Sequence, residues 1–419
     1  MIICIIGSGG REHAICKTIS LSSKASKIYC LPGNAGTQQL AENIDLDIDD
    51  FEKVLKFLKQ SKVDLVIVGP EKPLVNGVVD FLENNGIKVF GPRKIPSQLE
   101  GSKTFTKNIC KKYNIPTAKF GIFEKKENTI NFLKNSKFPI VIKADGLAAG
   151  KGVYISENLS EATEAVNEVF DGKFGIAKKI LVEEFLNGEE MSYFVISDGA
   201  THKFFQTAQD HKRVGENDTG KNTGGMGAYS PSRLYNTELD QKIKERIIEP
   251  TLNGIKELGA SYCGFLYIGL MIVNNDPYLI EFNVRMGDPE CQTILPILET
   301  DLGKIILACC DRKLNNIEIK WKKKKSVCVV LCSNGYPDDY KKNTKINQLK
   351  NVKLDSDEYL FHAGTKIENG EYLAIGGRVL NIIATTESFK ISKKKTLKIL
   401  NDIDWQEGFF RKDIAYKVT

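Results

Sequence analysis

The first 95 residues alternate between short apolar runs and segments with helical periodicity, and this alternation limits the possible folds more than any other feature of the sequence. The apolar runs lie at 2–6, 28–31, 64–68 and 87–90, and helical spacing begins at residue 11 and recurs over 51–59 and 73–83. Strands and helices that alternate with short links form a parallel, doubly wound sheet, so we expect a Rossmann-like N-terminal domain over residues 1–100. Ligands of such sheets bind beyond the carboxyl ends of the strands, which here are the loops GSGG, PGNAG and GPEKP.

The rest of the chain has a different organisation. Residues 101–325 mix strands and helices without regular alternation: strands are expected at 138–143, 180–184, 190–197, 264–273 and 278–285, and helices at 103–113, 159–170 and 237–258. Residues 326–419 are mainly β, and their hairpin turn Asn369-Gly370 is the strongest short-range turn signal in the chain. We therefore expect a multidomain α/β and α+β protein with three domains, 1–100, 101–325 and 326–419.

The charge distribution argues against a nucleic-acid partner. Lys and Arg exceed Asp and Glu by 6 over the whole chain, but the excess lies entirely after residue 302, where 23 basic residues accompany 14 acidic ones. Two lysine runs, 322–325 and 393–395, carry much of it, and neither is interleaved with the aromatic side chains on which nucleic-acid bases stack. We interpret both runs as solvated lysine faces.

The apolar runs and the cysteines indicate the compartment. The longest apolar run, 265–273, is about half of the roughly 20 residues that a membrane span requires, and Gly269 interrupts it. The N-terminus has no basic segment ahead of its short apolar run, so it does not match a secretion signal. The ten cysteines include no CxxC pair and no Cys/His metal spacing, which favours reduced, buried thiols. We expect a cytoplasmic protein without a membrane span.

The motif GSGGREHA, residues 7–14, connects the first expected strand to the first expected helix. Its glycines allow backbone N–H groups to approach a phosphate at the helix N-terminus. Glu12 stands where the dinucleotide fingerprint GxGxxG needs its third glycine, and the second strand ends without the carboxylate that binds a ribose. The motif therefore favours a phosphorylated small molecule over NAD, and a packing turn without a ligand is the alternative.

Two further segments indicate nucleotide binding. VIKADGLAAGKGV, residues 141–153, places Lys143 at the end of a strand and Lys151 in a loop of glycines and alanines that can close over a polyphosphate. It is not a Walker A loop, because Gly152 follows the second lysine where Ser or Thr is needed. LVEEFLNGEE, residues 181–190, can present backbone groups to an adenine edge and a carboxylate to a ribose, or it can form an ordinary acidic hairpin.

The segment YLIEFNVRMGDPE, residues 278–290, carries the strongest chemical signal. On a strand, residues two apart share a face, so Glu281, Asn283 and Arg285 line one side and the apolar residues 280, 282 and 284 line the other. Two side-chain oxygens at one point suit Mg2+, and an adjacent arginine suits a carboxylate or a phosphate. The alternative is an edge strand with a solvated polar face.

Residues 208–231 form an unusually long stretch without a secondary-structure pattern, and such stretches are often functional. The glycines and hydroxyl groups of this stretch suit contacts with an anion or a substrate, and its charged start, 210–213, is expected to face a reactive centre. A simple lid without direct contact to a ligand is the alternative.

Taken in order, these motifs resemble those of the ATP-grasp superfamily and, within it, of the phosphoribosylamine–glycine ligases. The resemblance covers essentially the whole chain and rests on GSGGREHA, PGNAGT, VGPEKPLVNGVVD, KADGLAAGKGV, EEFLNGEE, AQDHKR, NTGGMGAYSP, EFNVRMGDPE, FHAGT and GGRVLN. It implies a Rossmann-like N-terminal domain, an ATP-grasp core with a mobile lid over about 122–190, and a small β-rich C-terminal domain packed on the core.

The same resemblance implies a reaction. ATP, 5-phospho-D-ribosylamine and glycine give ADP, phosphate and glycinamide ribonucleotide through a glycyl phosphate intermediate, in the second step of de novo purine synthesis. The resemblance also implies ATP as co-substrate and Mg2+ or Mn2+ as the metal. We expect a monomer, or at most a weak dimer, whose partners are its small-molecule substrates and neither nucleic acid nor membrane.

Roles for individual residues follow from the resemblance as well. The expected ATP contacts are Lys103, Lys143, Gly150, Lys151, Gly152, Glu183, Leu186 and Glu190, where Glu183 and Leu186 present backbone to the adenine and Glu190 holds the ribose. The expected metal ligands are Glu281 and Asn283, and the expected catalytic residues are Arg285, Asp210, Lys212 and Asp288. The expected ribosylamine contacts are Gly9, Gly10, Glu12, His13, Asn34, Thr223, Gly224 and Gly225.

Three positions depart from the family pattern: Lys221 replaces a proline, Met286 an aromatic residue and Cys291 a threonine. None of these changes removes an expected ligand.

Two other functions stay open. Another ATP-grasp enzyme of the purine pathway, a formate-dependent transformylase or a carboxylase, should lack PGNAGT together with NTGGMGAYSP. A nucleotide-binding protein without enzymatic activity would not need the polar face of residues 281, 283 and 285.

Overall fold

The computed structural model describes residues 1–147, 152–173 and 179–419. Its N-terminal part is a parallel sheet in the order β3-β2-β1-β4-β5, formed by β1 (Ile2–Gly7), β2 (Lys27–Pro32), β3 (Glu42–Asn43), β4 (Leu65–Val68) and β5 (Val89–Phe90). The helices of this part are α1 (Gly10–Ser20), α2 (Phe51–Gln60), α3 (Glu71–Asn76), α4 (Val78–Asn84) and α5 (Lys94–Gly101). The strand order reverses at β1, as in a doubly wound sheet, which confirms the predicted Rossmann-like fold.

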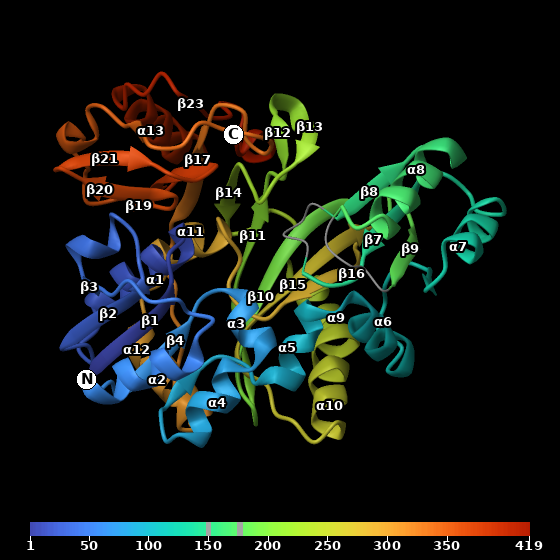
Figure 1. Ribbon diagram of the computed structural model, residues 1–419, viewed down its shortest axis with the longest axis horizontal. Helices are drawn as coiled ribbons and strands as arrows, with labels where there is room; N and C mark the ends of the chain where they lie inside the picture. Colours follow the sequence, from blue (N-terminus) through green and yellow to red (C-terminus); the bar gives the residue numbers. More distant parts are fainter. Residues whose placement is uncertain (148–151, 174–178) are drawn as a thin grey trace.

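A nine-stranded sheet runs from the middle of the chain into its C-terminal part (Figure 1). Its order is β16-β15-β10-β11-β14-β17-β22-β19, with β23 paired to β17. The strands are β10 (Glu189–Asp198), β11 (His202–Asp210), β14 (Gly227–Ser230), β15 (Cys263–Val273), β16 (Asp276–Asn283), β17 (Lys325–Ser333), β19 (Glu358–His362), β22 (Arg378–Thr386) and β23 (Gly408–Phe409).

The C-terminal strands extend the sheet of the core, whereas the sequence predicts only a β-rich domain packed on it. β14 pairs with β17, with Gly227 opposite Val329, so the sheet crosses the expected boundary at residue 325 without a break. Three short strands, β18 (Thr344–Lys345), β20 (Thr365–Glu368) and β21 (Glu371–Ala374), and the helix α13 (Phe389–Asp402) complete this part. The turn between β20 and β21 is Asn369-Gly370, with φ of 50° and 76°, which confirms the predicted hairpin.

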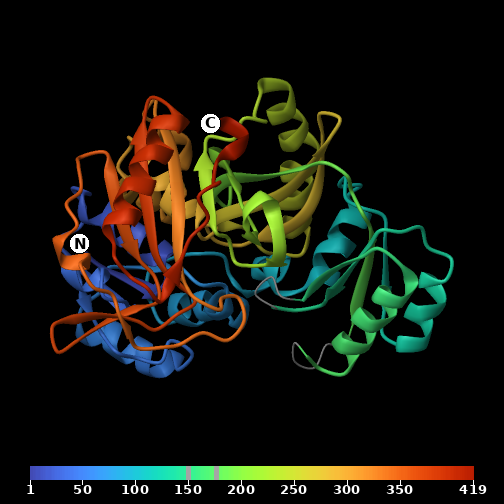
Figure 2. The same cartoon turned by 90° about the horizontal axis from the view of Figure 1, so that it is seen from above.

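A third sheet lies on the opposite side of the core from the N- and C-terminal parts (Figures 1 and 2). Its order is β6-β9-β7-β8, formed by β6 (Phe120–Phe123), β7 (Ile140–Ala144), β8 (Val153–Ser156) and β9 (Ile180–Glu184), together with the helices α7 (Lys126–Leu133) and α8 (Leu159–Phe170). Leu133, Ile142 and Val166 belong to a hydrophobic cluster within this unit and are 0% exposed. The unit therefore has a core of its own, and it occupies the part of the chain that was expected to form the lid.

Three segments differ from the pattern expected from the sequence. The helix expected over 73–83 is divided between α3 and α4 at Gly77, whose φ of 96° is left-handed. The helix expected over 237–258 consists of α9 (Thr237–Ile243), a π-helical turn over 244–248 and α10 (Glu249–Glu257). The stretch 208–231 is not structureless, since it contains the end of β11, the hairpin of β12 (Arg213–Gly215) and β13 (Thr219–Asn222), and β14. β14 pairs with β17, which lies far along the chain, and a local pattern does not reveal such a pairing.

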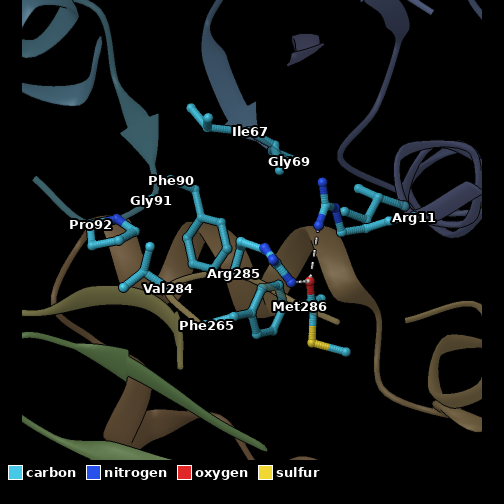
Figure 3. Close-up of a pocket in the computed structure, with 12 residues that line it drawn as sticks. Arg11, Ile67, Gly69, Phe90, Gly91, Pro92, Phe265, Val284, Arg285 and Met286 are labelled. Carbon is cyan, nitrogen blue, oxygen red and sulfur yellow. Dashed lines mark hydrogen bonds between the residues drawn. The ribbon is translucent and has the colours of Figure 1, made fainter. Parts of the chain in front are cut away.

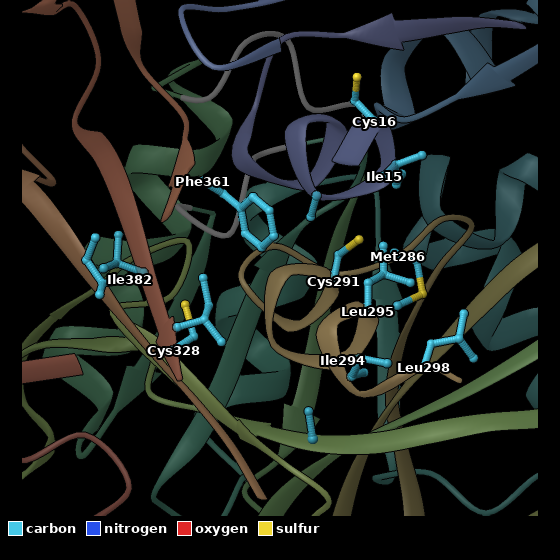
Figure 4. Packing of buried hydrophobic residues seen from close by; sticks show 14 of the residues in the cluster. Ile15, Cys16, Met286, Cys291, Ile294, Leu295, Leu298, Cys328, Phe361 and Ile382 are labelled. Atoms are coloured by element: carbon cyan, nitrogen blue, oxygen red, sulfur yellow. The ribbon is translucent and has the colours of Figure 1, made fainter. Parts of the chain in front are cut away.

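The short helix α11 (Glu290–Ile294) joins the parts of the molecule. All five of its residues are buried, and it packs between α1 and the strands β11, β14 and β17. Figure 4 shows Ile294 and Leu295 of this region among Ile15 of α1, Cys328 of β17 and Ile382 of β22. Because α11 directly follows the segment 281–289, its burial holds that segment against the N-terminal part, the core and the C-terminal part at once.

Two further helices, α6 (Lys103–Lys112) and α12 (Leu302–Cys310), complete the described secondary structure apart from short 3-10 turns. All ten cysteines are free and eight are buried, as expected for reduced thiols. Within the described ranges, no helix combines the length and the apolar character needed to cross a bilayer.

His13 of α1 joins the N-terminal sheet to the C-terminal part. Its ring is buried, and its Nδ1 accepts a hydrogen bond from the N–H of His362 in β19 at 2.8 Å. Burial, together with the neighbouring His362 and Lys17, lowers the pKa of His13 to about 3, and burial lowers the pKa of His362 to about 4. Both rings are therefore neutral near pH 7.

Protonation of these histidines should weaken the protein as the pH falls. When a histidine has a lower pKa in the folded chain than in the unfolded chain, the unfolded chain binds the proton first. Below pH 6.5 the free energy of unfolding then falls by up to about 1.4 kcal/mol per pH unit. His13→Asn keeps an oxygen acceptor near the position of Nδ1 and does not titrate. We expect this variant to lose about 2 kcal/mol less stability than the wild type between pH 7 and pH 5, as measured by urea unfolding. Equal losses in both proteins would show that His13 is not held neutral.

Candidate active site

The polar face of β16 carries the centre of the site. Glu281 and Asn283 are half-buried, while Phe282 between them is 2% exposed, as the strand alternation predicts. A bulge directly before Glu281 places Gly269 of β15 opposite it, and a side chain at Gly269 would come within 3.2 Å of the Glu281 Cγ. The strand ends at Asn283, so Arg285 lies on the segment beyond it.

Four cations lie close enough to Glu281 to favour its ionised form. They are Lys103 at the start of α6, Lys143 at the end of β7, Lys212 after β11 and Arg285 after β16. Burial of the carboxyl group opposes its ionisation, but these four positive charges together lower the pKa of Glu281. The structure thus brings four predicted residues, from four different segments of the chain, near a single ionised carboxylate.

Two carboxylates from the N-terminal hundred residues hold the guanidinium of Arg285. Its Nη2 donates to Glu100 at 2.6 Å and to the Asn283 Oδ1 at 3.2 Å, and its Nε lies 3.3 Å from Glu71. Glu100 also accepts the backbone N–H of Val284 at 2.8 Å. A planar guanidinium with acceptors on two edges keeps one orientation, so Glu71 and Glu100 determine which way Arg285 faces.

The carbonyl oxygen of Met286 accepts from Arg285 at 3.2 Å and from Arg11 at 3.3 Å (Figure 3). The two arginines line a cavity of about 10 Å3 together with Phe90 and Phe265, which is room for about one water. The Met286 side chain is 1% exposed in the core. The replacement of the family's aromatic residue by Met286 therefore changes only the packing of the side chain. The backbone carbonyl that binds both arginines is unaffected, because every residue type has one.

The sequence-based site did not include Glu71, Glu100 or Arg11. Glu71 and Arg11 stand in GPEKP and GSGGREHA, two segments expected to bind ligands, so their position in the sequence could have identified them as site residues. Glu100 lies near the end of α5 and belongs to no motif. Burial opposes the ionisation of Glu71, but Arg285 and Arg11 lower its pKa to about 2. Burial raises the pKa of Glu100 to about 7 although Arg285 opposes this, so Glu100 titrates near neutral pH.

Next to Glu281, acidic residues gather around Lys212. The Lys212 Nζ lies 2.6 Å from Glu190, so the residue predicted to act in catalysis and the one predicted to hold the ribose are partners of each other. Burial raises the pKa of Asp210 to about 8; neighbouring glutamates add to this effect and Lys212 opposes it. Glu290, which the prediction omitted, is 4% exposed and accepts a hydrogen bond from the Ser192 hydroxyl at 3.1 Å.

Asp288 lies where the predicted ribosylamine loops meet. A Cβ on Gly9 would lie 3.4 Å from the Asp288 Oδ2, and a Cβ on Gly225 would lie 3.6 Å from its carbonyl oxygen. The Nη1 of Arg378 is 3.2 Å from the Asp288 Oδ1 and donates to the carbonyl of Gly224 at 2.7 Å. Burial opposes the ionisation of Asp288, but Arg378 is the first of several cations that lower its pKa. The prediction omitted Arg378, although it stands in the GGRVLN motif.

Gly10 and Thr223 belong to the same region. A side chain at Gly10 would approach the Asn381 Nδ2 to 2.4 Å, so only glycine fits there without movement. The N–H and the hydroxyl of Thr223 donate to the carbonyl of Lys212 at 2.7 and 2.8 Å, which ties the glycine loop to the segment of Asp210 and Lys212.

Three of the predicted ribosylamine residues make extensive contacts within the protein. Glu12 accepts the N–H of Gly9 at 2.7 Å and the Nε–H of Arg11 at 2.6 Å. The Asn34 amide donates to two carbonyl oxygens at 2.9 Å and accepts from two backbone N–H groups, so within the described residues both its nitrogen and its oxygen already have protein partners. These contacts give Asn34 a structural role, and its expected part in recognising the ribosylamine stays a prediction. His13 has its Nδ1 occupied and does not offer it as a base.

Several of the expected nucleotide residues lie on α6 and on the sheet β6-β9-β7-β8, which is called the lid sheet below after the expected lid. The Lys103 Nζ donates to the carbonyl of Gly146 at 2.8 Å, which links α6 to the loop after β7. Lys143 forms an ion pair with Glu183. The prediction used only the backbone of Glu183, but its side chain is 3% exposed and paired inside the unit. Glu183 also lies between β6 and β7 in the sheet, and its backbone contact with adenine stays a prediction.

The remaining nucleotide residues border the loop after β7 and the segment after β9. Gly152 is buried, and its carbonyl accepts the N–H of Ala144 at 2.9 Å. Leu186 is half-buried in the short connection from β9 to β10. Gly150 and Lys151 lie outside the described residues.

The donors at Glu281 and Asn283 fit Mg2+ or Mn2+. Glu281 is ionised, and the Asn283 Oδ1 accepts one N–H from Arg285, which leaves it a second lone pair. Hard cations such as Mg2+ take oxygen ligands and keep several positions for water and phosphate oxygens, so two protein ligands are sufficient.

The other two departures from the family pattern do not reach this site. The Lys221 Nζ pairs with the exposed Asp338 at 2.8 Å, and Cys291 is a core residue that is 0% exposed.

Comparisons with known proteins give one result over the whole chain. Models of phosphoribosylglycinamide synthetase match in succession: the N domain over residues 1–100, the ATP-grasp domain over 101–291 and the C domain over 326–417. The phosphoribosylamine–glycine ligase of Brucella melitensis is 45% identical over 420 residues, which cover 100% of this chain and 98% of the relative. The crystal structure of the Thermotoga maritima phosphoribosylamine–glycine ligase is 33% identical, with a TM-score of 0.86 over 99% of this chain and 100% of that chain.

Structures outside this family share the fold alone. A biotin carboxylase from Campylobacter jejuni has a TM-score of 0.74 over 98% of this chain and 93% of its own, but is only 15% identical. Such a likeness shows that several enzymes use this architecture, and it carries no information about the substrate. The sequence matches over the full length, in contrast, distinguish one family from the others. They show that the chain belongs to the family of the phosphoribosylamine–glycine ligases, or phosphoribosylglycinamide synthetases.

Proposed function

We propose that the protein catalyses the ATP-dependent ligation of glycine to 5-phospho-D-ribosylamine, which gives glycinamide ribonucleotide, ADP and phosphate in the second step of de novo purine synthesis. The observation that carries this proposal is the convergence of four cations on Glu281, beside the loops gathered at Asp288. Transfer of a phosphoryl group to a carboxylate brings two anions together, and fixed positive charges compensate their repulsion. The names and full-length identity of the relatives support the same substrates.

ATP would bind between the lid sheet and the core, with its phosphates directed toward Glu281. Lys103 and Lys143 supply positive charge from α6 and β7, and Gly150, Lys151 and Gly152 belong to the loop expected to cover the phosphates. Leu186 would contact the adenine, and Glu190 would exchange its partner Lys212 for the ribose hydroxyls. Mg2+ or Mn2+ on Glu281 and Asn283 would neutralise charge on the phosphates.

Arg285 would orient the glycine carboxylate for attack on the γ-phosphorus. One N–H of its Nη1 donates to Met286, and within the described part of the chain the other is left for a carboxylate or a phosphoryl oxygen. The carboxylate oxygen forms the new bond to phosphorus as ADP leaves, which gives glycyl phosphate. The ribosylamine nitrogen then attacks the glycyl carbonyl and displaces phosphate. Because water would hydrolyse the acyl phosphate, closure of the lid over the site is part of the proposal.

We further propose the domain limits 1–100, 101–325 with a lid over about 122–190, and 326–419. The family matches over 1–100, 101–291 and 326–417 support these limits, and the lid sheet spans 120–184. Free and mostly buried thiols support a reducing compartment such as the cytoplasm.

The proposed reaction can be tested by omitting one substrate at a time. We expect phosphate release from MgATP to require both glycine and 5-phosphoribosylamine, because the glycyl phosphate is consumed only by the ribosylamine. Phosphate assays with glycine alone, with ribosylamine alone and with both distinguish the cases. Sustained release without the ribosylamine would point to another acceptor and to another ATP-grasp enzyme.

Glu281→Gln tests the central carboxylate. The amide keeps the shape of the side chain but removes the negative charge that holds the metal, so we expect turnover to fall by about a hundredfold or more. Asp276→Asn, at the other end of the same strand, is the matched control and should keep wild-type turnover. Thermal unfolding of both variants shows whether the fold is intact. Near-wild-type turnover of Glu281→Gln would contradict the role assigned to this residue.

A further inference from the structure

Lys107 lies at the junction between the core and the lid sheet, and none of the roles above includes it. Although it belongs to α6, it is 2% exposed. Its Nζ forms an ion pair with Glu183 of β9, donates to the Thr117 hydroxyl and lies 5.3 Å from the ring centre of Phe120. A buried lysine needs such partners, because an unpaired ammonium group is costly to bury.

The contacts of Lys107 connect the strand of the metal ligands to the lid. The Thr117 hydroxyl donates to the carbonyl of Leu279 at 2.7 Å, and Leu279 lies two residues before Glu281 on β16. The N–H of Leu279 donates to the carbonyl of Pro116 at 2.8 Å, so the chain is fixed to the core where it enters the lid. On the other side of Lys107, Glu183 belongs to the centre of the lid sheet.

Glu183 divides its two oxygens between two lysines. Its Oε1 faces Lys107 and its Oε2 faces Lys143. Burial opposes the ionisation of Glu183, but the charges of Lys143 and Lys107 lower its pKa, so the carboxylate is ionised. One lysine would be sufficient to neutralise it, and the group of three therefore carries one positive charge in excess. Lys143 is the member of this group that also lies close enough to Glu281 to lower its pKa.

We propose that Lys107 is a positioning residue, which keeps Glu183 paired so that Lys143 can leave this carboxylate and bind a nucleotide phosphate. This inference rests on the proposed function, because it requires that the chain binds ATP or ADP. Without Lys107, Lys143 would be the only cation among the described residues that pairs with this buried carboxylate, and its transfer to a phosphate would leave Glu183 charged and unpaired. The cost of that unpaired charge would appear as weaker nucleotide binding.

Binding of MgADP to the full-length protein, measured by isothermal titration calorimetry, tests this proposal. We expect Lys107→Met to weaken binding by at least about tenfold, because the variant retains Lys143 on Glu183. In the double variant Lys107→Met with Glu183→Gln the carboxylate is absent, so affinity should return to within about threefold of the wild type. Lys112→Met removes an exposed ion pair of the same helix and is the matched control, with unchanged affinity expected.

A purely structural role of Lys107 predicts a different result. Wild-type affinity of Lys107→Met, or a double variant that binds no better than Lys107→Met, would overturn the proposal. If Lys107→Met is unfolded in a thermal scan, Glu183→Gln alone decides: affinity equal to or above that of the wild type supports the proposal, and weaker binding overturns it. Wild-type protein that fails to bind MgADP would instead overturn the proposed function, and this inference with it.

Discussion

Mutual neutralisation of buried charges around Arg285 and Glu281 is the interaction on which the arrangement of this protein depends. Arg285 follows the last strand of the core, and its partners Glu71 and Glu100 come from the N-terminal hundred residues. Glu281 in turn is stabilised by Lys143 of the lid sheet, among other cations. A buried charge without its partner costs several kcal/mol, so each part of the chain supplies groups that another part needs. The site exists only when these parts are assembled.

Two features of the fold hold this assembly in place. The nine-stranded sheet continues from the core through the pairing of β14 and β17, so the C-terminal strands cannot shift relative to the glycine loop at 223–225. The buried helix α11 packs against α1 and this sheet, and it fixes the segment that carries Asp288. The lid sheet has a separate hydrophobic core. Its described links to the site include Lys143, which lowers the pKa of Glu281, and the carbonyl of Gly146, which accepts from Lys103 of α6. A separate unit at this place suits the proposed lid, because water would hydrolyse the acyl phosphate of the proposed reaction.

Local patterns predicted much of this correctly. The alternation of the first 95 residues specified the Rossmann-like sheet, and the period of two on β16 placed Glu281 and Asn283 opposite the buried Phe282. Such predictions succeed because they depend on spacing within one element. The contacts of Asn34 could not be predicted in this way, since its hydrogen bonds go to backbone groups of the loop after β1, of β19 and of its own turn. Glu100 was missed because it stands outside every motif until the fold brings Arg285 beside it. Glu290 was missed although it ends the EFNVRMGDPE motif, because its influence on Asp210 depends on the tertiary structure.

The sequence by itself determined the elements and the chemical groups: strands and helices follow from apolar periodicity, and lysines, carboxylates and glycines were recognisable in their motifs. Only the tertiary structure decided which charges face each other and which carboxyl groups stay ionised. It also decided which polar side chains bind other groups of the protein. The physical reason is that burial and Coulomb interactions depend on distances between atoms from different elements. Glu71 and Glu100 illustrate this, because both contact Arg285 and yet have pKa values of about 2 and about 7.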